Sequence, residues 1–222
     1  MNGVLGAILP LAIAVTISPV PIIAEILLLF TSKPVATAGA YLAGFLIGVA
    51  AVLGILVVVA NAIDLSTSGP SRGVAVVQLA LGVLLLVASV RKFRSRPAQG
   101  DVAPEPTWMQ GIAGFSPGKS LGVGVAIGAG NPKNIAVGIA AAGAISSAGL
   151  HTGQSIIAVA FYVIVAGMGV AAPFVVTVVL RDRAEGILDG WKAWLSKSNA
   201  AVMAVLFLIF AVVLIGRGIA GL

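Results

Sequence analysis

The sequence predicts an all-α polytopic membrane protein with six transmembrane helices, arranged as two inverted three-helix repeats with broken first and fourth helices. Of its 222 residues, 59% are hydrophobic and 9% are charged, whereas soluble domains carry roughly 25% charged residues. Apolar stretches reach the length of about 20 residues that a helix needs to cross a bilayer. Residues 48–60 are apolar on every face, which excludes the alternating strands of a membrane β-barrel.

Six hydrophobic segments account for these stretches. The first would measure about 43 Å as a straight helix, well over a hydrocarbon core of roughly 30 Å, so we expect it to be broken or re-entrant. The apolar run 134–180 exceeds two span lengths and is divided at the turn residues 146–153. The segments are expected at 3–31, 35–61, 72–91, 119–147, 154–180 and 198–218.

The distribution of basic residues predicts the orientation of a single membrane domain, 1–222. The proline-containing stretch 92–118 is expected to be a cytoplasmic connector between a first three-span repeat, 1–91, and a second, 119–222. Loops that follow odd-numbered spans carry ten Lys and Arg residues, and the opposite side carries two. The positive-inside rule therefore predicts that both termini lie outside the cytoplasm. The expected location is the inner (plasma) membrane.

Residues 182–197 are expected to form a separate short helix in the cytoplasmic interface. Ile187, Leu188, Trp191, Trp194 and Leu195 share one helical face, and charged residues lie elsewhere. This pattern is typical of an interfacial anchor, with a gate as the alternative.

Prolines interrupt the first and fourth segments at corresponding positions. A proline lacks the backbone donor, so the helix is expected to break and the freed carbonyls must find partners. Interrupted helices at matching positions of inverted halves indicate a transporter site near the membrane midplane, with two structural kinks as the alternative. The candidate substrate-binding residues are Ser18, Pro19, Pro21, Glu25, Asn131, Pro132, Lys133 and Asn134.

Glu25 and Lys133 are the charged residues inside these spans. An ionisable group in hydrocarbon costs at least about 2.5 to 3.5 kcal/mol on insertion scales, so each is expected to face a partner or a wet cavity. If the breaks meet, the two are candidate partners that exchange protons or hold a charged substrate. A structural ion pair, or a Lys133 that binds helix-end carbonyls, is the alternative.

Several classes of function have no support in the residues present. Cysteine is absent and His151 is the one histidine, so thiolate metal sites and bis-histidine haem ligation are excluded, and no cofactor is expected. The spans contain no catalytic acid pair or His/Ser constellation, so an enzyme is not expected. The net charge of +6 is better explained by anionic lipid and topology than by nucleic acid.

The two proline motifs resemble those of the LysE superfamily of small exporters, which carry Ser/Thr-Pro-x-Pro in the first span and Asn-Pro-Lys in the fourth. Here these are residues 18–21 and 131–133. Residues 17–29, the short basic turn and Tyr-Leu-Ala-Gly-Phe at 41–45 look most like the actinobacterial peptidoglycolipid-addressing family, also called the sulfolipid-addressing or GAP family. The resemblance implies a six-span protein that helps to move cell-envelope glycolipids to the surface, with Pro19, Pro21, Pro132 and Lys133 as motif positions.

Two departures from these patterns limit what the resemblance carries over. Val20 stands where the amino-acid exporters have glycine, which weakens a transfer of amino-acid specificity. The position of Glu25 is usually apolar in the lipid-addressing pattern, so its role rests on burial alone. Metal-exporting relatives rely on several intramembrane acidic residues, so a divalent-cation site is not expected.

The leading expectation is a transporter or export factor that moves an envelope glycolipid or a similar amphipathic substrate through a central site at the two breaks. The first alternative is a proton-coupled exporter of a small polar solute such as an amino acid, with Glu25 as the proton carrier and Lys133 as the anion contact. The second is a non-transporting scaffold subunit of a lipid-export machine. Expected partners are membrane lipid, a glycolipid substrate, and a homodimer partner or a larger export machinery.

Overall fold

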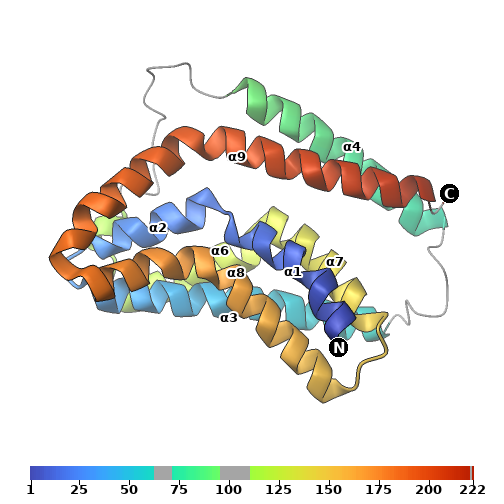
Figure 1. Cartoon of the computed structure of the whole chain (residues 1–222), viewed down its shortest axis with the longest axis horizontal. Helices are drawn as coiled ribbons and strands as arrows, with labels where there is room; N and C mark the ends of the chain where they lie inside the picture. Colours follow the sequence, from blue (N-terminus) through green and yellow to red (C-terminus); the bar gives the residue numbers. More distant parts are fainter. Residues whose placement is uncertain (63–71, 96–110, 221) are drawn as a thin grey trace. The chain divides into compact units, whose positions relative to one another are not determined.

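The computed structural model describes residues 1–62, 72–95, 111–220 and 222, and this part of the chain is helical without strands (Figure 1). Residues 63–71 and most of the predicted connector, 96–110, lie outside the described residues. The helices and short 3₁₀ turns follow in chain order as α1 (Asn2–Thr16), α2 (Pro19–Leu29), α3 (Pro34–Ala62), α4 (Arg72–Arg94), η1 (Ile112–Gly114), α6 (Pro117–Gly130), α7 (Pro132–Ser146), α8 (Thr152–Leu180), η2 (Arg181–Arg183) and α9 (Ala184–Ala220).

Each predicted hydrophobic segment coincides with helix, and both predicted breaks are confirmed. The first segment divides into α1 and α2, whose axes differ by 54°. The fourth divides into α6, which ends at Gly130, and α7, which begins at Pro132. Proline is favoured at the first position of a helix, where its missing N–H has no intrahelical partner to lose. The same residues that end one half-helix therefore start the next.

Several helices are long and apolar enough to cross a membrane. Among the described residues, the stretches Pro34–Ala62, Thr152–Ser198 and Ala200–Ala220 meet this criterion, and the bent pair α1 and α2 adds a fourth if it counts as one span. The described part of the chain is thus all-helical, with apolar helices typical of a membrane protein. The sequence predicts six spans, which is more than the three or four that meet this criterion among the described residues.

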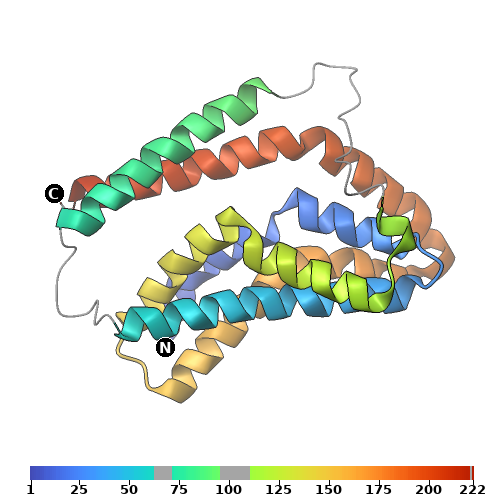
Figure 2. The same cartoon turned by 180° about the vertical axis from the view of Figure 1, so that it is seen from behind.

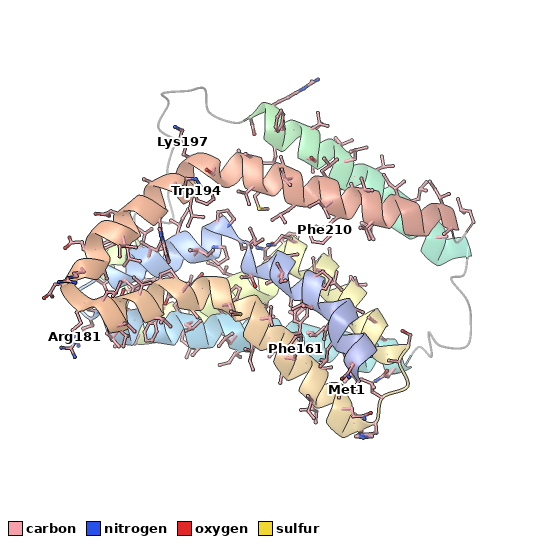
Figure 3. All side chains as sticks on the ribbon, in the orientation of Figure 1. Met1, Phe161, Arg181, Trp194, Lys197 and Phe210 are labelled. Atoms are coloured by element: carbon pink, nitrogen blue, oxygen red, sulfur yellow. The ribbon has the colours of Figure 1, made fainter. Side chains whose placement is uncertain are left out.

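The predicted separate helix at 182–197 is wrong, because residues 182–183 belong to η2 and residues 184–197 are the first part of the continuous helix α9. The sequence has no proline after Pro173 that would end a helix here. The chain instead turns at η2, where Arg181 adopts a positive φ of 47°. Leu188 and Leu195 are buried as expected of an apolar face, whereas Trp194, labelled in Figure 3, is 61% exposed.

The described chain forms two compact units, of which the first holds α1 to α3, η1, α6 to α8, η2 and the start of α9. Within it, α3 lies against α6 (Figure 2). Four glycines allow this contact: a Cβ on Gly44 or Gly48 would meet the backbone of α6 at 2.1 and 2.5 Å, and one on Gly124 or Gly128 would meet α3 at 2.2 and 2.5 Å. Small residues four apart thus bring two backbones together.

A second close approach joins α8 to α1. A Cβ on Gly169 would lie 2.2 Å from the carbonyl oxygen of Thr16. The Thr16 hydroxyl donates to the carbonyl of Ala12 at 3.1 Å and also to that of Val165 in α8. The C-terminal end of α1 is therefore held against the middle of α8.

The second compact unit consists of α4 and the later part of α9. Its two helices also approach through glycines, since a Cβ on Gly82 would lie 2.9 Å from the backbone nitrogen of Ile215. The buried hydroxyl of Ser89 donates to the carbonyl of Ala204 at 2.7 Å. Hydrogen bonds of this kind satisfy a polar side chain away from water.

Candidate functional site

The first break leaves the end of α1 short of backbone donors. In a continuous helix, the carbonyl of Ile17 would accept from the N–H of residue 21, which is proline here. The carbonyl of Ala14 would accept from Ser18, but the Ser18 N–H donates to Thr16 instead, at 2.9 Å. Ser18 is extended and precedes the first residue of α2, Pro19. The carbonyl of Val15 also lacks its helical donor, because residue 19 is proline. Three carbonyls at this break therefore need donors from elsewhere.

At the second break, the side chain of Asn131 caps the N-terminus of α7. The Oδ1 atom of Asn131 accepts the backbone N–H of Lys133 at 3.0 Å, which satisfies one of the free donors in the first turn of α7. Pro132 at the first helical position withholds the donor that Gly128 would use. The Nδ2 group of Asn134 replaces it and donates to the Gly128 carbonyl at 3.2 Å.

Lys133 joins the two breaks. Its Nζ atom donates to the carbonyl of Ala14 at 2.7 Å, to that of Ile17 at 3.4 Å, and to the hydroxyl of Ser18. The residue is only 5% exposed. A cation at the C-terminal end of α1 is also stabilised by the negative end of that helix dipole. The expectation that the breaks lie next to each other is therefore confirmed.

Of the two partners that the sequence left open for Lys133, the structure shows the helix-end carbonyls and not Glu25. An ammonium group has three donors, and Lys133 directs its donors to Ala14, Ile17 and Ser18. Glu25 lies one turn beyond Pro21 in α2 and is fully buried, and neither of its carboxyl oxygens has a hydrogen-bond partner among the described residues. Lys133 therefore binds backbone carbonyls of the first break and not the carboxylate of Glu25.

Tyr41 contributes a contact that the sequence did not reveal. Its hydroxyl donates to the carbonyl of Pro21 at 3.2 Å. Pro21 and Glu25 are four residues apart and share one face of α2. Tyr41 is fully buried and belongs to α3, so it fixes the first turn of α2 to the neighbouring helix. No local sequence pattern pairs Tyr41 with the carbonyl of Pro21, because the contact depends on how α3 packs against α2.

A small, mainly apolar hollow lies beside the second break. The cavity measures about 10 Å³, and its lining includes Asn134 of α7 and Tyr162 of α8. The Oδ1 atom of Asn134 and the hydroxyl of Tyr162 are buried without a protein partner among the described residues. A hollow of this size fits one water-sized group. The second half thus keeps two unpaired polar atoms close to the break.

The predicted site residues divide into three roles. Ser18 and Lys133 touch each other across the breaks. Asn131 and Asn134 satisfy the backbone of the second break, and Pro19, Pro21 and Pro132 lie in the first turns of α2 and α7. Glu25 stands outside this hydrogen-bond network. The described residues contain no group of three His, Cys, Asp or Glu side chains that could hold a metal ion.

The Ser18–Lys133 contact brings the first turns of α2 and α7 together, and each helix has the positive end of its dipole there. Few free N–H groups accompany these dipoles, because the prolines of both first turns have no N–H and the N–H of Lys133 is capped by Asn131. The Lys133 ammonium is bound at the first break in this state, so it is available to an anion only after it leaves the α1 carbonyls.

A comparison with protein families matches residues 8–220 to the family model described as Sap, sulfolipid-1-addressing protein. No curated protein matches the chain. No solved structure matches it either.

Proposed function

Because the chain belongs to the family of sulfolipid-1-addressing proteins, we propose that it moves a cell-envelope glycolipid or a similar amphipathic lipid through the site where its two helix breaks meet. The observation that carries this proposal is the bond of Lys133 in the second break to Ala14, Ile17 and Ser18 in the first. A sulfated headgroup is the kind of anion that a lysine and two helix N-termini would attract.

The proposed architecture is six spans in two inverted halves within the plasma membrane, with both termini outside. The pattern of basic loops supports this orientation. The composition of the compact units supports the repeat, since α1 to α3 and α6 to α8 enter the first unit, and α4 and the later part of α9 enter the second. Each half thus contributes its first two segments to one unit and its third to the other.

Two helix contacts also support the repeat. The first half-helix of the second repeat, α6, lies against the second segment of the first repeat, α3. The corresponding pair in the other direction, α1 and α8, is also in close contact. Reciprocal pairs of this kind are expected when inverted repeats meet at a pseudo-two-fold axis. The motif resemblance to LysE superfamily exporters favours the same arrangement.

In the proposed mechanism, the headgroup competes with the α1 carbonyls for Lys133. The state described by the structure holds the ammonium on Ala14 and Ile17. An anionic headgroup at the N-termini of α2 and α7 would draw Lys133 away and free the end of α1 to move. Alternating exposure of this site would carry the headgroup across. The sequence contains no nucleotide-binding motif, so a gradient or a partner protein supplies the energy.

A lipid-translocation assay tests the proposal. The purified protein is placed in liposomes with a fluorescent sulfated glycolipid, and the fraction that crosses the bilayer is read with a membrane-impermeant quencher. Lys133→Met is expected to lower the rate about tenfold or more, because a charge-assisted contact is worth about 1.5 to 3 kcal/mol. Lys119→Met, on the exposed first turn of α6, should leave the rate unchanged. Equal rates in wild type and Lys133→Met would contradict the proposal.

A second candidate is favoured by the burial of Glu25 without a partner. In this alternative, the protein exports a small polar solute such as an amino acid, and Glu25 carries the coupled proton. Flux of labelled alanine into proteoliposomes that collapses in Glu25→Gln but not in Glu185→Gln, an exposed position in α9, would establish this alternative. Absence of alanine flux in the wild type would exclude it.

The alternative that the chain is a non-transporting scaffold predicts a third result for these variants. If the chain only assembles a lipid-export machine, Lys133→Met and Glu25→Gln should leave lipid delivery in cells intact, while changes at helix interfaces abolish it. The name of the family is compatible with export and with an accessory role. The same two variants therefore separate all three readings.

A further inference from the structure

An apolar groove lies between α3 and α8, away from the helix breaks. It has a volume of about 560 Å³ and is lined by the second half of α3, from Ala50 to Asn61, and by the first half of α8 with Leu150. Its walls are aliphatic side chains such as Val57, Val159 and Val163. Sites for small molecules typically measure about 300 to 1,000 Å³ and are mostly apolar.

The polar side chains of the groove gather at one end. Asn61 lies in the last turn of α3, and Thr152 and Ser155 lie in the first turn of α8. None of the lining residues is charged. These groups donate and accept hydrogen bonds without carrying charge, which suits hydroxyl groups better than a phosphate.

The length of the groove matches one leaflet. Ala50 and Asn61 are 11 positions apart, which is about 16 Å along a helix at 1.5 Å per residue. The hydrocarbon core is about 30 Å thick, so this is close to half of it. Both helices lie in stretches long enough to span a membrane, and the lining residues Val58, Ile156 and Ile164 are 63 to 68% exposed. The open side of the groove therefore faces acyl chains.

From these features we infer that the groove is a binding site for one acyl chain of a glycolipid, whose sugar hydroxyl groups lie at Asn61, Thr152 and Ser155. In the proposed orientation, the polar end lies at the outer surface of the membrane. The site then receives the lipid after it has crossed, and this reading of its role rests on the proposed function.

The groove adjoins the hollow beside the second break. Val49 and Leu53 of α3 line the hollow, and the next residues, Ala50 and Gly54, line the groove. On α8, Tyr162 lines the hollow and Val163 the groove. Consecutive residues of the same two helices thus separate the two spaces. The groove therefore lies next to the hollow along the contact between α3 and α8.

Photolabelling in nanodiscs tests the site without measuring transport. The probe is a galactosyl diacylglycerol with a diazirine in one acyl chain, and mass spectrometry locates the adducts. We expect adducts at Val57, Val159 and Val163, in preference to Ile55, which is 63% exposed on α3 but lies outside the groove. Adducts spread evenly over Ile55 and the groove residues would overturn the inference, because they would indicate ordinary annular lipid.

Two matched variants on α3 sharpen the test. A Cβ on Gly54 would meet no atom within 4 Å, so Gly54→Trp should fill the groove without disturbing the helix and lower groove labelling about tenfold, which corresponds to about 1.4 kcal/mol. Ala51→Trp, at an exposed position outside the lining, should not lower it. Ala160→Leu, on the opposite wall, repeats the test. Equal labelling in all these variants would overturn the inference.

Competition and cross-linking separate the remaining outcomes. Unlabelled galactosyl lipid should displace the probe better than phosphatidylglycerol with the same chains. Equal displacement would show that Asn61, Thr152 and Ser155 do not recognise the headgroup, and would overturn that part of the inference. Protein–protein adducts at these residues, in place of lipid adducts, would show that a second copy fills the groove and would overturn the inference. A labelled groove in a protein that moves no lipid would refute the proposed function alone. Lipid movement without groove labelling would refute the groove alone.

Discussion

At the scale of single residues, the prolines of the site leave backbone carbonyls without hydrogen-bond donors. Pro21 and Pro132 withhold donors from Ile17 and Gly128. Lys133 and Asn134, adjacent in the sequence, supply the missing hydrogen bonds to these two carbonyls. Polar backbone groups buried away from water must be paired. Lys133 therefore satisfies backbone carbonyls and links the two breaks.

The hydrogen bond from Asn134 to Gly128 can be tested with an isosteric change. Asn134→Asp keeps the shape of the side chain but replaces the donor with an oxygen facing the Gly128 carbonyl. Because a buried acceptor then lacks its partner, we expect a loss of about 1 to 3 kcal/mol of stability. Thermal unfolding in detergent measures this as a lower Tm.

Asn131→Asp is the matched control, three residues away. Asn131 acts as an acceptor in its cap, and aspartate caps a helix N-terminus as well as asparagine does. This variant should keep or raise the Tm. Equal losses in the two variants would show that the Asn134 donor does not matter.

The candidate site was predictable in position but not in pairing. The motifs at Pro21 and Pro132 identified both breaks. The sequence left two partners open for Lys133, the carboxylate of Glu25 and the carbonyls at a helix end, and the structure shows the second. Following the carbonyl of residue i−4 for each proline would have found one partner of Lys133 and the role of Asn134. The Thr16–Val165 bond depends on tertiary contact, so no local pattern could have shown it.

At the scale of helices, close packing of α3 on α6 depends on glycine. Gly124→Ala would place a methyl group 2.2 Å from the carbonyl of Tyr41. Because overpacking of a tight interface costs about 1 to 3 kcal/mol, we expect a clearly lower Tm in detergent. Gly122→Ala in the same helix meets no atom within 4 Å and should be neutral or stabilising. A neutral result for Gly124→Ala would contradict the α3–α6 contact.

Helix positions followed from the sequence more closely than helix ends. The apolar segments matched the helices, because burial and lipid select the same residues. The spacing of Gly44 and Gly48 indicated a real contact, but the same spacing at Gly118 and Gly122 did not, since neither has a neighbour within 4 Å. Spacing alone gives no information about which face meets a partner. The charge pattern changes near residue 197, but α9 continues through it, because neither proline nor any other helix-breaking signal accompanies the change.

At the scale of the whole molecule, the inverted arrangement predicts which loops share a side of the membrane. The chain has no cysteine, so single cysteines can be introduced without background. Lys33→Cys and Lys119→Cys are expected on the cytoplasmic side and His151→Cys outside. An impermeant maleimide should label only the last of these in intact cells. Labelling of all three from one side would contradict two inverted halves.

The central claim is that the two helix breaks meet, and a cross-link across them tests it most directly. In membranes, the pair Ser18→Cys and Lys133→Cys is treated with a short bifunctional thiol reagent, and the pair Ser18→Cys and Lys119→Cys serves as the control. Because the Ser18 and Lys133 side chains touch, whereas Lys119 lies at the other end of α6, only the first pair should give an intramolecular link. If that pair reacts with single thiol reagents but forms no link, the breaks do not meet and the proposed site does not exist.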